Sequence, residues 1–198
     1  MLCAEAGIDF DVAFIDSDYN YPETVPLIER LCNKYNKKLI KLPYDIDPLE
    51  VYIKLGVYYD NSKKGKAFDI FQQSTFYAND KKYEVNITGI RKMESKLRTF
   101  ILARSKGFEY SKKRETHFFS PIWDYRNNDV YACITALGEE YHDIYYRAKD
   151  LKEREWRRVN WYINSNCIEK GTVHELKKEY PELYYKLVAK VPYLRTHV

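Results

Sequence analysis

The sequence lacks the residue spacings of a metal-binding or disulfide-bonded protein. Its four cysteines stand far apart and form no CxxC pair; they are Cys3, Cys32, Cys133 and Cys167. The four histidines are scattered as well, so that no zinc or iron–sulfur spacing exists. We therefore predict reduced, mostly buried thiols, no metal site formed by these residues, and a cytoplasmic location.

Long apolar runs are also absent. No run of about 18 apolar residues occurs, and no charged segment followed by an apolar one opens the sequence. A helix that crosses a membrane and a secretory signal each need such a run. We expect neither membrane insertion nor secretion.

The net charge is small overall, but positive charge is concentrated in one segment. The 198 residues carry a net charge of +4, which does not demand a polyanionic partner. Residues 91–115, in contrast, hold nine Lys or Arg residues against three Glu residues, a net charge of +6. Such a segment suits a ligand that bears phosphate or sulfate, or a nucleic acid; a solvated helix face is the alternative. Nucleic acid is the less favoured partner, because the sequence contains no recognised nucleic-acid motif.

Apolar runs and helical periodicities alternate along most of the chain. Strands are predicted at 11–16, 37–44 and 83–90, helices at 23–35, 47–56, 66–78, 91–105 and from Asn128 or Asp129 to 137, and a strand and loop at 107–125. This alternation predicts an α/β fold with an open, mostly parallel sheet and helices on both faces. We expect one domain over residues 1–160, with a helical extension over 161–198 that packs on it.

The sequence "ITGIRKMESKLR" places a group of polar side chains directly after a predicted strand. Arg91, Glu94, Ser95 and Arg98 follow one another at helical offsets, so that a continuous helix would carry all four on one face and Met93, Leu97, Phe100 and Ile101 on another, toward the sheet. Two guanidinium groups at the start of a helix can bind a phosphate or sulfate, with Ser95 as a donor and Glu94 as the orienting carboxylate. The alternative is an exposed ladder of salt bridges.

A second polar group follows the first predicted strand. Asp16 and Ser17 would present a carboxylate and a hydroxyl at the carboxyl end of that strand, where ligands of open α/β sheets bind. An acid in this place suits a ribose hydroxyl or a magnesium ion. Plain turn formation explains the same residues equally well, since Asp, Ser and Asn favour turns.

Two aromatic residues precede the last predicted helix of the main domain. Trp123 and Tyr125 lie in "SPIWDYRNNDVYACI". Exposed aromatic rings there could stack on a base, whereas buried rings would pack the domain. We favour packing.

Taken together, these segments resemble the phosphoadenosine phosphosulfate (PAPS) reductase family, which includes the small subunit of sulfate adenylyltransferase and reductase-like proteins of phages and of DNA sulfur modification. "VAFIDSDYNYPETVPLIERLCNKY" resembles the strand, turn and helix of the family, "ITGIRKMESKLR" resembles its GxRxxES..R signature, and "SPIWDYRNNDVYACI" resembles its PI.DW...DVW.YI segment. "EEYHDIYYRAKDLKEREWRRVN" is similar to the following stretch of the reductase-like subgroup. The resemblance covers residues 1–160.

The resemblance implies an adenine nucleotide alpha-hydrolase-like fold and an adenylyl nucleotide, ATP or PAPS, as ligand rather than a permanently bound cofactor, with magnesium as a companion ion. Gly89 and the four polar residues at 91–98 would lie beside the phosphosulfate or the nucleotide phosphates. Asp16 and Ser17 would lie near the nucleotide. The activity implied is that of an oxidoreductase or a sulfur-group transferase.

The sequence also departs from the family pattern. It contains no SGGxDS-type phosphate loop, so that the first strand and its loop are missing by truncation, by a misplaced start or by real loss. Cys167 stands in "NSNCIEKG", which differs from the ECG.H segment of the reductases. These departures keep two hypotheses open beside nucleic-acid binding: an enzyme of sulfur activation or transfer, which we favour, and a family member without catalysis that acts as a binding or regulatory protein, in a homo-oligomer or hetero-oligomer.

Overall fold

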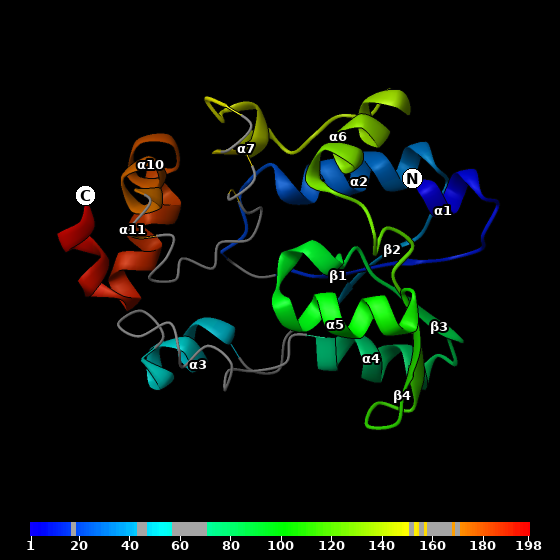
Figure 1. The fold of residues 1–198 in the computed structure, drawn as a ribbon. Coiled ribbons are helices and arrows are strands. Elements are labelled where there is room, and N and C mark those ends of the chain that lie inside the picture. The colour runs from blue at the N-terminus through cyan, green and yellow to red at the C-terminus, as the bar shows by residue number, and fades with distance from the viewer. Residues whose placement is uncertain are drawn as a thin grey trace. The chain divides into compact units, whose positions relative to one another are not determined.

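The structure is a computed structural model, and it describes residues 1–16, 19–42, 47–56, 71–150, 153–154, 157, 168 and 171–198. The chain divides into two compact units, and Figure 1 labels their helices and strands. Unit 1 comprises Met1–Glu5 and Phe71–Trp156, and unit 2 comprises Ala6–Ile70 and Arg157–Val198. Ser17, Cys167 and the predicted domain boundary at residue 160 lie outside the described residues.

Unit 2 contains the predicted strand, helix and strand of the first part of the sequence. β1 (Val12–Ile15) and β2 (Leu39–Leu42) pair in parallel, with Val12 opposite Leu39, and α2 (Thr24–Lys34) connects them. The apolar runs form the strands because β-branched and other apolar side chains suit a pleated, half-buried surface. The parallel arrangement predicted for this pair is confirmed.

The rest of unit 2 is helical. It contains α3 (Pro48–Leu55), α10 (Thr172–Glu179), α11 (Pro181–Lys190) and the 3-10 helix η3 (Pro192–His197). Leu49, Val173, Leu187 and Leu194 are the largest fully buried side chains of the described residues. The Tyr180 hydroxyl donates to Glu23 Oε1 at 2.9 Å, so that the glutamate of the "PET" segment is bonded to the C-terminal helices.

Unit 1 holds a three-stranded sheet in the order β3-β5-β4. β3 (Val85–Ile87) and β5 (Thr116–Phe119) are parallel, and β4 (Phe108–Ser111) forms an antiparallel hairpin with β5. The other elements are α1 (Leu2–Glu5), α4 (Phe71–Asp80), η2 (Lys92–Glu94), α5 (Lys96–Ser105), α6 (Asn127–Ala136) and α7 (Asp143–Tyr146). The described sheets therefore contain more parallel than antiparallel pairs, as the predicted α/β class requires.

The prediction of one continuous helix over 91–105 was wrong. Arg91 and Ser95 have extended backbones, with φ of −126° and −163°, so that a 3-10 turn at 92–94 precedes a separate α-helix. This break changes the phase of the helix, and Leu102 becomes its buried residue. The four apolar residues expected to face the sheet, Met93, Leu97, Phe100 and Ile101, are instead exposed.

The predicted N-cap of α6 was also wrong. The helix is capped at Arg126, two residues before Asn128. Asp129 stands in the first turn, where its Oδ2 accepts a hydrogen bond from the Arg126 N–H at 2.7 Å. A carboxylate in the first turn satisfies a free backbone donor as well as a cap does.

A search of the described residues finds no helix long and apolar enough to span a bilayer.

Candidate functional site

The candidate site begins where β3 and β5 end. The Thr88 N–H donates to the Phe119 carbonyl at 2.8 Å, and the Thr88 and Ser120 hydroxyls share a hydrogen bond of 2.9 Å. Because the two strands are parallel, both carboxyl ends lie at the same edge of the sheet. Ligands of open α/β sheets bind at such an edge.

The loops that leave the two strands are joined to each other. The Lys92 N–H donates to the Trp123 carbonyl at 2.8 Å. The Lys92 ammonium lies 5.3 Å from the centre of the Trp123 ring and forms an ion pair with Asp124. These contacts fix the segment that carries Arg91. They also support the packing role that we predicted for Trp123.

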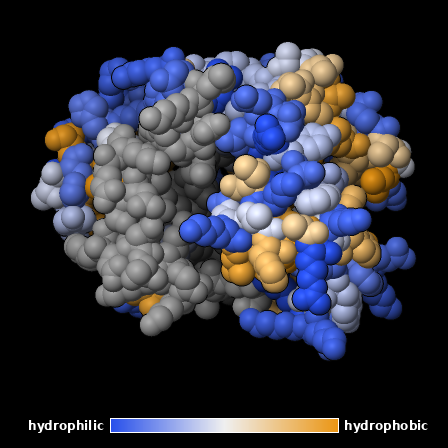
Figure 2. Space-filling view, viewed as in Figure 1, coloured by the Kyte–Doolittle hydropathy of each residue, from blue (hydrophilic) through white to orange (hydrophobic). Residues whose placement is uncertain are grey.

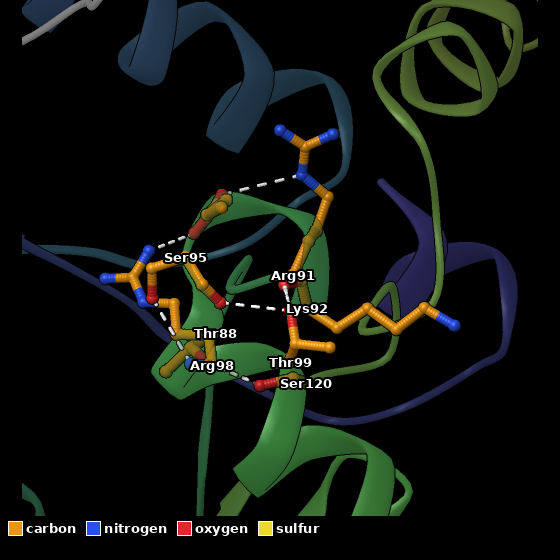
Figure 3. A network of polar contacts seen from close by, with 8 residues as sticks. Thr88, Arg91, Lys92, Ser95, Arg98, Thr99 and Ser120 are labelled. Carbon is orange, nitrogen blue, oxygen red and sulfur yellow. Dashed lines mark hydrogen bonds and ion pairs between the residues drawn. The ribbon is translucent and has the colours of Figure 1, made fainter.

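Arg91 and Arg98 both contact Glu94, and Figure 3 marks these contacts as dashed lines from the two labelled arginines. Arg91 Nε lies 3.5 Å from Glu94 Oε1, and Arg98 Nη1 donates to Glu94 Oε2. The Arg91 side chain is 17% exposed and the Arg98 side chain is 41% exposed. The two arginines therefore differ: Arg91 is largely withdrawn from water, while Arg98 belongs to the exposed salt-bridge ladder that was the alternative interpretation.

Arg91 retains a buried donor that the described residues do not use. Its Nη1 atom is shielded from solvent and has no hydrogen-bond partner in the described part of the chain. A buried donor without an acceptor costs about 1–3 kcal/mol, and more when it is charged. An anion bound at this atom would remove that cost.

Tyr131 of α6 lies in the electrostatic field of Arg91. Burial raises the pKa of Tyr131 to about 12, while the charges of Arg154 and Arg91 oppose the shift. The Arg154 guanidinium lies 5.1 Å from the centre of the Tyr131 ring. Tyr131 is therefore a neutral hydroxyl at physiological pH, beside two cations.

Ser95 has a structural role in the site. Its hydroxyl accepts a hydrogen bond from the Arg98 N–H at 3.2 Å, which makes it the N-cap of α5. The Thr99 hydroxyl donates to the Lys92 carbonyl at 2.6 Å and is also within 3.1 Å of the Ser95 carbonyl. Both side chains hold the turn between Arg91 and α5, as Figure 3 shows.

Ser95→Ala is expected to lower the free energy of unfolding by about 1 kcal/mol, because the first turn of α5 loses its cap. Ser95→Asp should retain most of the stability, since Asp is an equally good N-cap and its charge suits a helix N-terminus. Urea unfolding followed by circular dichroism measures both changes. Equal stability of the alanine variant and the wild type would contradict the capping role.

The remaining predicted residues divide between the two units. Gly89 lies in unit 1, in the segment between Thr88 and Arg91, and a Cβ atom added there would meet no atom within 4 Å. Asp16 lies in unit 2, directly after β1, and its Oδ1 accepts a hydrogen bond from the Asn20 side chain at 3.1 Å. That bond is the turn interaction weighed above as the alternative role of Asp16.

The sequence did not single out several residues of this edge: Thr88, Lys92, Ser120 and Tyr131. Thr88 and Ser120 each follow a strand by one residue, which is a signal that could have identified them. Tyr131 carries no such signal, because only the packing of α6 brings it near Arg91. Within the described ranges, no group of three His, Cys, Asp or Glu residues could hold a metal ion.

Comparison with known proteins identifies the family. The sequence model of the phosphoadenosine phosphosulfate reductase domain matches residues 1–183, and the chain therefore belongs to that family. A crystal structure of the phosphoadenylyl-sulfate (PAPS) reductase of Candida auris, in complex with phosphate, has a similar fold, with a TM-score of 0.52. It is 16% identical in sequence, and the match covers 82% of this chain and 74% of the other. No curated protein matches the sequence.

Proposed function

We propose that the chain binds an adenylyl nucleotide that bears a phosphate or phosphosulfate group, as part of sulfur activation or transfer. The observation that carries this proposal is the Arg91 side chain, which is largely buried, fixed at Nε by Glu94, and left with a buried Nη1 donor that no described residue uses. It lies in the segment that leaves the carboxyl end of a parallel strand, where α/β folds bind nucleotides.

The chemistry of the site suits a tetrahedral anion. Glu94 contacts one edge of the Arg91 guanidinium, which leaves the terminal nitrogens for a phosphate or sulfate oxygen. The neutral Tyr131 hydroxyl can donate or accept a further hydrogen bond. Arg91 would bind the anion and offset its charge, and Tyr131 would help to orient it.

The described cysteines give no evidence of a nucleophile. Burial raises the pKa of the Cys32 thiol, which disfavours the reactive thiolate. Cys3 and Cys133 are free thiols. We therefore propose the binding residues of the site and leave its catalytic group unassigned.

Arg91→Ala is expected to weaken the binding of PAPS about 10-fold to 150-fold, because one charge-assisted hydrogen bond contributes about 1.5–3 kcal/mol. Arg98→Ala should have a smaller effect, since the Arg98 side chain is more exposed and already bonded to Glu94. Isothermal titration calorimetry with PAPS, ATP and inorganic phosphate measures these affinities.

Arg104→Ala is the matched control, because Arg104 is an exposed arginine of α5 with the same charge. Its affinity for PAPS should equal that of the wild type. Equal affinities for the wild type and Arg91→Ala would refute the proposed site. Turnover of PAPS or ATP by the wild-type chain would favour the enzyme over a binding protein without catalysis.

A further inference from the structure

One face of the β4–β5 hairpin carries exposed aromatic rings. Phe108 and Tyr110 alternate with Glu109 along β4, so that both point to the same face of the sheet. The strand register places His117 opposite Tyr110 and Phe119 opposite Phe108, on that same face. Phe108 is 51% exposed and Tyr110 is 53% exposed. Two large aromatic side chains therefore meet water on a regular surface.

The rings are held in a row by contacts among themselves. The His117 ring stacks on Phe108 with a centroid distance of 5.4 Å and an interplanar angle of 13°. The same His117 ring lies 5.0 Å from the Tyr110 ring. Mutual packing of this kind restricts ring rotation, so that the row is ordered before any ligand arrives.

The opposite face of the hairpin is anchored within unit 1. Thr116 is buried, and its hydroxyl accepts a hydrogen bond from the Asn86 side chain of β3 at 3.1 Å. The Asn79 side chain of α4 donates to the Arg114 carbonyl at 2.9 Å. These bonds fix the hairpin from the side that does not carry the exposed aromatic row.

Positive charge lies at both ends of the aromatic row. Lys112 and Lys113 are exposed at the tip of the hairpin, and Lys106 is exposed just before β4. Arg114 lies 5.2 Å from the centre of the Phe118 ring, on the face of the hairpin opposite the aromatic row, and Glu115 is the carboxylate of the tip. Figure 2 shows strongly hydrophilic side chains at the place where Figure 1 puts the lower end of β4. Glu109 belongs to the other face of the strand.

We propose that this hairpin face binds a single-stranded nucleic acid. Unpaired bases would stack on Phe108 and Tyr110, and the neighbouring phosphates would contact Lys112 and Lys113. Base stacking on aromatic rings combined with a basic border is the arrangement that such ligands require.

The alternatives fit this surface less well. A duplex keeps its bases stacked inside and would not use the rings. A second copy of the chain, in a symmetric contact through this face, would bring two basic tips together. A mainly apolar protein surface would leave the lysines without counter-charges.

The test is fluorescence anisotropy of the whole chain with labelled 12-nucleotide oligo(dT) and oligo(U), which distinguishes DNA from RNA as the source of the strand. We expect the chain to bind at least one of the two oligonucleotides, with an affinity that falls steeply between 50 and 200 mM salt. The logarithm of the binding constant should fall with the logarithm of the salt concentration with a slope of about −0.7 per phosphate contact. Phe108→Ala with Tyr110→Ala should reduce the affinity at least about tenfold, and Phe108→Tyr with Tyr110→Phe should retain it. Lys112→Gln with Lys113→Gln should reduce the salt slope.

Tyr185→Ala is the control, because Tyr185 is an exposed aromatic residue of α11 in the other unit. It should bind as the wild type does. Circular dichroism confirms the fold of each variant. No binding of either oligonucleotide at 50 mM salt would overturn the proposal. The proposal would also be overturned if the alanine variants were folded and bound the oligonucleotides with unchanged affinity. It would be overturned as well if inorganic polyphosphate, which has charge but no bases, bound as tightly as the oligonucleotides.

Discussion

Gly107→Ala is expected to lower the free energy of unfolding by about 2–5 kcal/mol. A Cβ atom at this position would lie 2.5 Å from Trp123 Cδ1 and 2.7 Å from the Ser120 carbonyl oxygen. The Ser120 carbonyl belongs to the backbone and cannot move without displacing the end of β5. In addition, Gly107 has a φ of +80°, a backbone conformation that residues with a Cβ atom rarely adopt.

Gly138→Ala separates the two causes. Gly138 has a similar φ of +65°, but a Cβ atom there would meet nothing within 4 Å. Only the backbone strain applies, and the expected loss is about 1–2 kcal/mol. Urea unfolding measures both variants. Equal losses would show that Trp123 does not pack against Gly107 as described.

Glu175→Ala is expected to destabilise unit 2 by about 3 kcal/mol, because it removes the carboxylate that pairs with a buried guanidinium. Arg157 is only 5% exposed, and its Nη1 donates to Glu175 Oε1 at 2.6 Å. Loss of this carboxylate leaves part of the cost of burying the cation without compensation. Breaking a buried ion pair usually costs about 3–5 kcal/mol, and we expect the lower end of this range because the Glu175 side chain is 27% exposed.

Glu179→Ala is the control for this prediction. Glu179 lies on the same helix, α10, and its contact with Lys178 is at the surface. Exposed ion pairs contribute about 0–1 kcal/mol, so the control should remain close to the wild type. Thermal unfolding at a fixed salt concentration compares the two variants. A loss in Glu175→Ala no larger than that in Glu179→Ala would contradict a structural role for the buried pair.

Much of the fold could be predicted from local patterns. The apolar runs at 11–16 and 83–90 became strands, and the periodic segment 23–35 became α2, because burial of one face or of a whole strand dictates where apolar residues stand. The proposal that Arg91 follows a strand depended only on this alternation. That part of the site was therefore accessible from the sequence.

The predictions differed from the structure where the backbone geometry departs from the helical spacing of the residues in the sequence. Helical offsets assigned Arg91 and Arg98 equivalent positions, but the extended backbone at Ser95 separates them, so that one is largely buried and the other is partly exposed. A serine followed by a helix is a common N-cap, and this signal within "MESKLR" competes with the periodic pattern. Over residues 107–125 one strand and a loop were predicted, whereas the structure has two strands, β4 and β5, in an antiparallel hairpin.

The ring of Trp123 has a consequence for how the sequence can vary. Its indole occupies the space where any side chain at position 107 would lie, and its carbonyl accepts the hydrogen bond that positions the residue after Arg91. A relative with a bulkier amino acid in place of Gly107 therefore needs both a smaller residue in place of Trp123 and a displaced backbone at Ser120. Substitutions at position 107, at the start of the hairpin, are then coupled to substitutions at position 123, in the loop that is bonded to the segment carrying Arg91.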